Sequence, residues 1–88
     1  MTNLAFTRIL KIVDRQWEFN FRKLPGDELL FHGDVTDAKG ARILFQMYRD
    51  ENGSWRARGA NLPLWIIAAE DQMGAAIEQA LSEPQTGW

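Results

Sequence analysis

The stretch ARILFQMYRDENGSWRARG, residues 41–59, has the pattern of two β-strands joined by a tight turn. Apolar and polar residues alternate on both sides of DENG, residues 50–53, as they do in strands with one buried face. Asn-Gly between two such segments favours a hairpin turn, because both residue types tolerate positive φ. The stretch therefore predicts an antiparallel hairpin with Trp55 turned inward and with Arg56 and Arg58 turned outward.

The preceding residues continue this pattern. QWEFNFRK (16–23) alternates aromatic and polar residues without a break, and the Pro-Gly sequence LPGD (24–27) predicts a turn after it. ELLFHGDVT (28–36) alternates less regularly and ends at DAKG (37–40), where the glycine favours a second turn. Four strands with short connections predict an antiparallel meander, and its apolar face must be covered by another element.

The apolar period changes to three and four residues from Pro63 onward, which predicts a helix that covers the sheet. Its apolar positions are Ile66, Ala69, Met73, Ala76, Ile77 and Ala80. Its expected solvent-facing positions are Glu70, Asp71, Gln72, Glu78 and Gln79. Gly74 costs about 1 kcal/mol relative to alanine within a helix. We therefore expect Gly74 to mark a close approach of the helix to the sheet, or else a kink.

The predicted fold class is α+β: a four-stranded antiparallel β-meander followed by one C-terminal α-helix packed on one sheet face. The chain of 88 residues is long enough for one domain, which we place at residues 16–82. Residues 1–15 fit either a strand or a short helix, and we favour a strand that runs on towards Trp17. Residues 83–88, after the helix-ending Pro84, are expected to form a C-terminal tail.

Charge is distributed unevenly along the chain. The net charge is −2, yet all ten lysines and arginines lie in residues 1–62, while residues 63–88 carry four acids and no basic residue. This asymmetry fits either a basic working surface or a sheet and a helix of complementary charge. No run approaches the roughly 20 apolar residues of a membrane helix, and no signal peptide is recognisable. We expect a cytoplasmic protein with no membrane partner.

The residues for catalysis and metal binding are few. The chain has no cysteine and one histidine, His32, with Asp34 two residues further along the same strand face. A His–Asp pair can serve as a general base, but no nucleophile and no further metal ligands accompany it. No phosphate-binding glycine loop is present. We therefore predict a protein without enzymatic activity, metal or small-molecule cofactor.

The outward face of the predicted sheet combines arginines with an aromatic side chain and the histidine. Arginine neutralises phosphates, and tyrosine offers a platform on which bases stack. The candidate nucleic-acid-binding residues are Arg22, His32, Arg42, Tyr48, Arg56 and Arg58. Two alternatives stay open: Leu30, Leu44 and Tyr48 would also suit a protein–protein interface, and a solvated sheet carries scattered apolar residues without any function.

A known group of proteins shares this order of elements. The segments QWEFNFRK, ELLFHGDV, DAKGARILFQMYRD, ENGSWRARG and LPLWIIAAEDQMGAAIEQAL together form a ββββα pattern. The pattern resembles the repeat of the Pur-alpha family, and it is similar to the single-strand-binding domain of positive cofactor four and to the Whirly proteins. The resemblance implies a small homodimer that binds single-stranded DNA or RNA through basic and aromatic residues on its sheets. Arg42, Tyr48, Arg56 and Arg58 are the matching residues.

Overall fold

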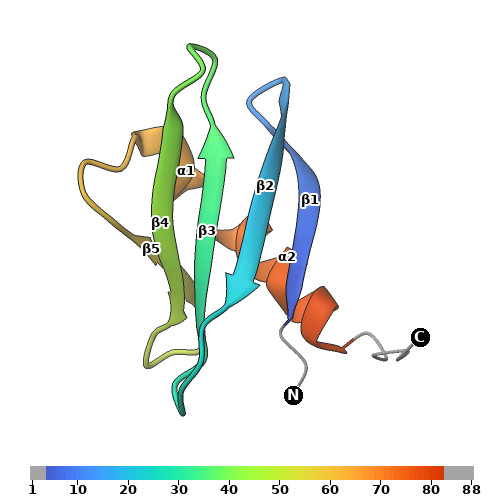
Figure 1. Ribbon diagram of the computed structural model, residues 1–88, viewed down its shortest axis with the longest axis vertical. Helices are drawn as coiled ribbons and strands as arrows, with labels where there is room; N and C mark the ends of the chain where they lie inside the picture. Colours follow the sequence, from blue (N-terminus) through green and yellow to red (C-terminus); the bar gives the residue numbers. More distant parts are fainter. Residues whose placement is uncertain (1–3, 83–88) are drawn as a thin grey trace.

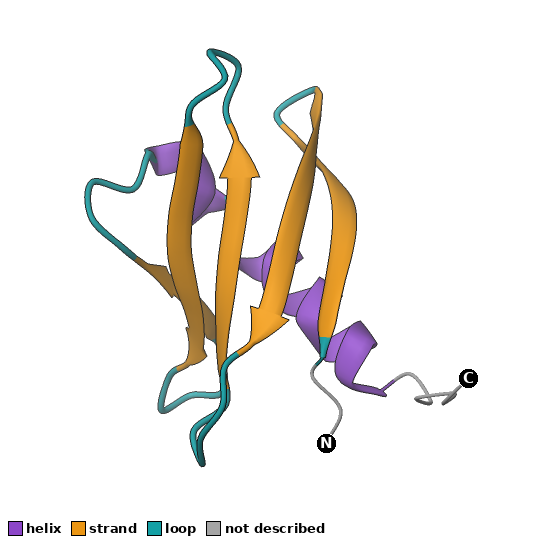
Figure 2. Ribbon diagram, viewed as in Figure 1, coloured by secondary structure: helices purple, strands orange, loops and turns teal. Residues whose placement is uncertain are grey.

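The computed structural model describes residues 4–82, which form one five-stranded antiparallel sheet with two helices on one of its faces (Figure 1). The elements in chain order are β1 (Ala5–Ile12), β2 (Arg15–Lys23), β3 (Leu30–Thr36), β4 (Arg42–Arg49), β5 (Trp55–Arg58), α1 (Leu64–Ala68) and α2 (Glu70–Ser82). The strands pair with their chain neighbours in the order β1-β2-β3-β4-β5. Figure 2 shows both helices behind the sheet, so the opposite face carries no covering element among the described residues.

The predicted antiparallel α+β arrangement is confirmed, but the prediction of four strands is one short. Residues 5–12 form β1, which does not run on to Trp17, because Val13 and Asp14 turn the chain back into β2 with φ values of 48° and 62°. Inward side chains of β1 pack on the same core as those of β2. The described part of the N-terminal segment therefore belongs to the sheet and is part of the domain. Residues 1–3 and the predicted tail, 83–88, are not among the described residues.

The predicted single helix is interrupted at Ala69. Its N–H donates to the Ile66 carbonyl at 3.0 Å, which closes α1 in a short turn before α2 begins. All six predicted apolar positions are buried. The prediction that Glu70 faces solvent is wrong, because its side chain turns back to the sheet at the start of α2 and only 9% of the residue is exposed. The carboxylate accepts a hydrogen bond of 2.8 Å from the Ala57 N–H of β5.

Aromatic side chains fill the core between the sheet and the helices. Phe19 and Phe31 are fully buried, and the Phe31 ring lies edge-on to Trp55 at a centroid distance of 5.9 Å. Gly74 allows the close approach that its position in the helix predicts. A Cβ atom at this position would lie 2.6 Å from the Trp55 Cβ, so α2 touches β5 here with no room for a side chain.

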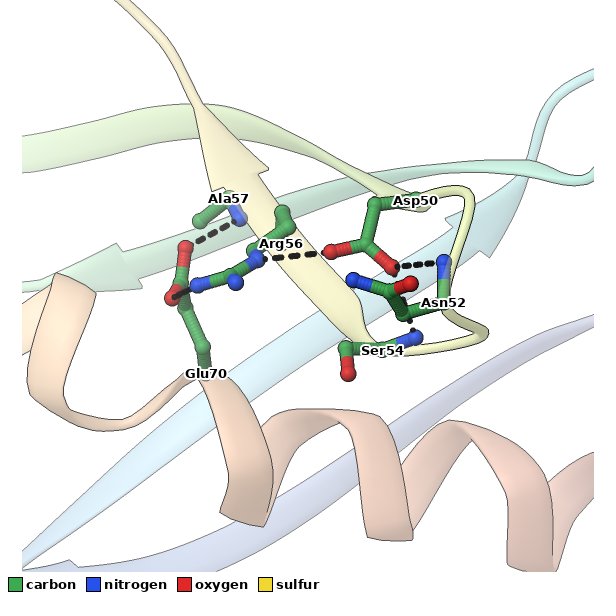
Figure 3. A network of polar contacts seen from close by, with 6 residues as sticks. All are labelled: Asp50, Asn52, Ser54, Arg56, Ala57 and Glu70. Carbon is green, nitrogen blue, oxygen red and sulfur yellow. Dashed lines mark hydrogen bonds and ion pairs between the residues drawn. The ribbon is translucent and has the colours of Figure 1, made fainter.

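The DENG turn between β4 and β5 is held by one carboxylate (Figure 3). The side chain of Asp50 accepts hydrogen bonds of 2.9 Å from the N–H groups of both Asn52 and Ser54. Gly53 takes a φ of 80°, as the Asn-Gly signal predicts. The Ser54 amide, followed by the Arg56 guanidinium, lowers the pKa of Asp50 below its ordinary value of 3.8.

Asp50→Asn should therefore lower the melting temperature at neutral pH. The amide oxygen can still accept from the turn, but the charge that holds Arg56 is lost. Because the folded pKa is depressed, the carboxylate stabilises the fold above its unfolded pKa, and this contribution disappears as the pH falls through the folded pKa. Thermal melts followed by circular dichroism should show the two proteins converging at acidic pH. An equal difference at every pH would contradict this assignment.

Candidate functional site

The face of the sheet opposite the helices, which we call the open face, carries most of the candidate residues. The outward side chains that define it are Thr7, Asn20, Arg22, His32, Asp34, Arg42, Leu44, Gln46, Tyr48 and Arg58. Strict alternation along β2, β3 and β4 places them there, because their chain neighbours occupy the core. The face therefore follows directly from the pattern in the sequence.

Strand register aligns four of these residues in one row across the sheet. Arg22 is the cross-strand partner of His32, His32 of Gln46, and Gln46 of Arg58. Directly opposed side chains in an antiparallel sheet have Cβ atoms about 4.5–5.5 Å apart. The row therefore runs from β2 to β5, with an arginine at each end and the histidine inside it.

A second row holds a network of hydrogen bonds. The Thr7 hydroxyl donates to Asn20 Oδ1 at 2.7 Å, and Asn20 Nδ2 donates to Asp34 Oδ1 at 3.0 Å. Arg42 Nη2 donates to the other carboxylate oxygen of Asp34 at 3.1 Å. Asp34 is buried, whereas the Arg42 side chain is 66% exposed. The buried carboxylate thus anchors an accessible guanidinium and limits its rotamers, which favours binding of a carboxylate or a phosphate.

Two hollows meet on the open face at His32. The larger has a volume of about 410 Å³ and is lined by both the network and the arginines Arg22 and Arg42. The smaller, of about 300 Å³, is lined by Leu44, Gln46 and Arg58 among others. His32 lines both. The result is a depression that crosses several strands, with basic groups in each half.

Tyr48 and Arg58 form a stacked pair at the β5 side of this face. The Arg58 guanidinium lies over the Tyr48 ring at 5.0 Å from its centroid, and its Nε donates to Gln46 at 3.1 Å. The predicted stacking platform is therefore covered on one side by a cation. A planar ligand would meet the guanidinium, which also stacks on aromatic rings.

Arg56 is the cross-strand partner of Tyr48, but its guanidinium is held by carboxylates and does not join the other candidates. Its Nε contacts Asp50 at 3.0 Å and its Nη1 contacts Glu70 at 3.5 Å, so the guanidinium lies between two carboxylates at the β5 edge (Figure 3). The pKa of Arg56 is raised, mainly by Asp50. Two carboxylates contact this single positive charge, whereas Arg42 contacts Asp34 and its side chain is more exposed, 66% against 51%. The structure thus brings together Arg22, His32, Arg42, Tyr48 and Arg58 but sets Arg56 apart.

Sequence reasoning missed the supporting residues of the site. The sequence pattern places Asn20 and Asp34 at outward positions of two strands. They form a network because the strand register makes them direct cross-strand partners. Thr7 was not placed on a face, because residues 1–15 fitted either a strand, which we favoured, or a short helix. The signal available in the sequence was the alternation of Phe6, Leu10 and Ile12 with Thr7 and Lys11, which the apolar Ile9 weakens.

The fold and the site define an α+β protein with helices on one face of a five-stranded meander and a hollowed, arginine-lined surface on the other. No known protein family, curated protein or solved structure matches the chain. Neither helix within residues 4–82 has the length and apolar character needed to cross a membrane. The same part of the chain contains no group of three or more His, Cys, Asp or Glu residues that could bind a metal ion.

Proposed function

We propose that the open face binds single-stranded nucleic acid, DNA or RNA, without catalysis. The observation that carries this proposal is the pair of hollows that share His32 and are lined by arginines in each half. Arg22 and Arg58 stand on β2 and β5, three strand spacings apart, which corresponds to about 14 Å. A ligand that contacts all the arginines must therefore be both anionic and extended.

The hollows favour a single strand over a duplex. The larger one falls within the volume range of small-molecule sites, roughly 300–1,000 Å³, so it can admit an unpaired base. Its walls carry the amide of Asn20 and the carboxylate of Asp34, which can bond base edges. A duplex keeps those edges paired and presents mainly phosphates.

The proposed mechanism combines phosphate contacts with stacking. Arg22, Arg42 and Arg58 would neutralise three phosphates, which predicts a slope of log affinity against log salt of about −2 for a single strand. The Arg58–Tyr48 pair would stack on a base. A homodimer and a cytoplasmic location belong to the same proposal, as the sequence and its resemblance lead us to expect.

A protein partner is the second candidate function. Leu44 is 53% exposed on the open face beside the smaller hollow, which is the kind of position an interface covers. Binding through such residues would depend little on salt. The salt response therefore separates the two candidates.

The experiment is fluorescence anisotropy of a labelled mixed-sequence single strand, titrated with the protein at low and moderate salt. We expect binding that salt weakens and that unlabelled duplex competes poorly. The double variant Arg22→Ala/Arg42→Ala should bind about tenfold more weakly, because each removed guanidinium takes a phosphate contact with it.

A matched control is the double variant Lys23→Ala/Lys39→Ala. It removes the same number of positive charges from positions that line neither hollow of the open face. Its affinity should stay within about twofold of the parent, because long-range electrostatics are screened within roughly 10 Å at 0.1 M salt. Equal losses in both variants would contradict a defined site, and no binding at low salt would overturn the proposal.

A further inference from the structure

The two edges of the sheet differ in how their backbone groups are used. At the β5 edge, the outward Ala57 N–H is bonded to the buried Glu70 carboxylate, and α2 packs beside the strand. The other edge is β1, which is eight residues long. Natural sheets usually cover or interrupt such an edge, because its free N–H and C=O groups can pair with another chain.

The pairing pattern shows which β1 groups face outward. Lys23 N–H donates to the Leu4 carbonyl at 2.8 Å, so Leu4 and Lys23 form a hydrogen-bonded pair. Hydrogen-bonded and non-bonded pairs alternate along antiparallel strands. Every second residue of β1 thus directs its backbone groups away from β2. These residues are Ala5, Thr7, Ile9 and Lys11.

An apolar side chain stands in the middle of this edge. Ile9 is 64% exposed, and it projects from the open face between Thr7 and Lys11. One outward carbonyl of this edge, that of Thr7, accepts a hydrogen bond of 3.2 Å from Nη1 of its neighbour Arg8. A long edge with a central exposed isoleucine has the features of a strand that pairs with another strand. The opposite edge has only four residues in its strand and a carboxylate on one of its outward amides.

We propose that β1 pairs antiparallel with β1 of a second copy about a two-fold axis at Ile9, so that two five-stranded sheets become one of ten strands. In this register Ile9 faces its own copy, and Thr7 faces Lys11 of the other molecule. A register centred on Arg8 would place two guanidinium groups opposite each other, which is unfavourable. The outward N–H and C=O groups of both strands are then paired.

The inner face of the sheet fits this arrangement. The last turns of α2 lie near the beginning of β1 (Figure 1), and Leu81 is exposed there. At the other end of β1, a hollow of about 160 Å³ is lined by Ile12, Arg15, Trp17 and Trp65 among others. Antiparallel pairing brings the α2 end of one copy beside this hollow of the other. Leu81 can then be covered by the aromatic side chains that line this hollow.

The pairing would also complete the open face, a consequence that rests on the proposed function. Thr7 lines the larger hollow, so Lys11 of the second copy would stand at its rim and add a positive charge. The two open faces would become one continuous surface. The larger hollow of each copy would then be built from both molecules.

The test is sedimentation equilibrium of the free protein, with no nucleic acid present. We expect a dimer for the parent. Ile9→Pro removes an outward N–H, which an edge strand tolerates, and should give a monomer with unchanged circular dichroism. Ile9→Lys keeps the N–H and should also give a monomer, so it decides the matter if the proline variant does not fold. Leu64→Lys changes an apolar residue that is 85% exposed on α1 and should stay a dimer.

A parent protein that is monomeric at its highest soluble concentration would overturn the proposal, as would a dimer that persists in both Ile9 variants. A monomer would remove the homodimer from the proposed function. Nucleic-acid binding by the open face is measured separately, in the anisotropy titration. Lys11→Ala links the two: it should weaken binding severalfold in the dimer and have a smaller effect in the Ile9→Lys background. An equal effect in both backgrounds would show that Lys11 of the second copy is not part of the binding site.

Discussion

Phe31→Ala should destabilise the protein by about 3–5 kcal/mol. Phe31 is fully buried on the central strand β3, and its ring contacts Phe6 and Trp55 at centroid distances of 6.2 and 5.9 Å. Truncation would remove both contacts and leave a cavity that β3, paired on both sides, cannot close. A loss of this size approaches the whole stability of a small domain, which is about 5–15 kcal/mol.

Urea denaturation followed by tryptophan fluorescence would measure this loss. Leu44→Ala is the matched control, because Leu44 lies on the adjacent strand but on the open face, where it is 53% exposed. It should change the free energy of unfolding by no more than about 0.5 kcal/mol. Comparable losses in both variants would mean that the two faces of the sheet have been assigned incorrectly.

Gly74→Ala should destabilise the protein by about 1–2 kcal/mol, although alanine is the better helix former by about 1 kcal/mol. The added Cβ would lie 2.6 Å from the Trp55 Cβ and 2.7 Å from its Cδ1. The Trp55 Cβ is fixed to the strand backbone, so relief requires α2 to move away from β5. Overpacking of this kind costs typically 1–3 kcal/mol, which outweighs the gain in helix propensity.

The neighbouring exposed position supplies the control for Gly74. Ala75→Gly should destabilise by about 1 kcal/mol through helix propensity alone, because Ala75 faces solvent. Both variants are then expected to lose stability, although they change propensity in opposite directions. A Gly74→Ala protein with a higher free energy of unfolding than the parent would contradict the close contact between α2 and Trp55.

The strands from residue 16 to residue 59 were predictable because each buries one face and is bounded by turn residues. β1 could not be predicted in this way, because two periods fit its sequence equally well. Phe6, Ile9, Leu10 and Val13 fit one face of a helix, and Phe6 and Leu10 fit one face of a strand. Only pairing with β2 decides between these periods. The interruption at Ala69 was equally hidden, since an alanine within an apolar run carries no breaking signal.

For the candidate site, alternation placed Arg22, His32, Arg42 and Arg58 on one face. It could not show that Arg56 is neutralised, because Glu70 lies 14 residues further along the chain and reaches it only after α2 folds against β5. Charge balance between distant elements is a tertiary property. Sequence patterns therefore show readily which side chains point away from the core. They show less readily which of those side chains keep an accessible charge.

The central claim is that the open face binds a single nucleic-acid strand, and the most direct measurement is a ¹H–¹⁵N correlation spectrum of the protein titrated with an unlabelled single-stranded oligonucleotide. The account predicts amide shifts concentrated at Asn20, Arg22, His32 and Gln46, around the two hollows. Shifts confined to α1 and α2 on the opposite face, or none at all, would contradict it.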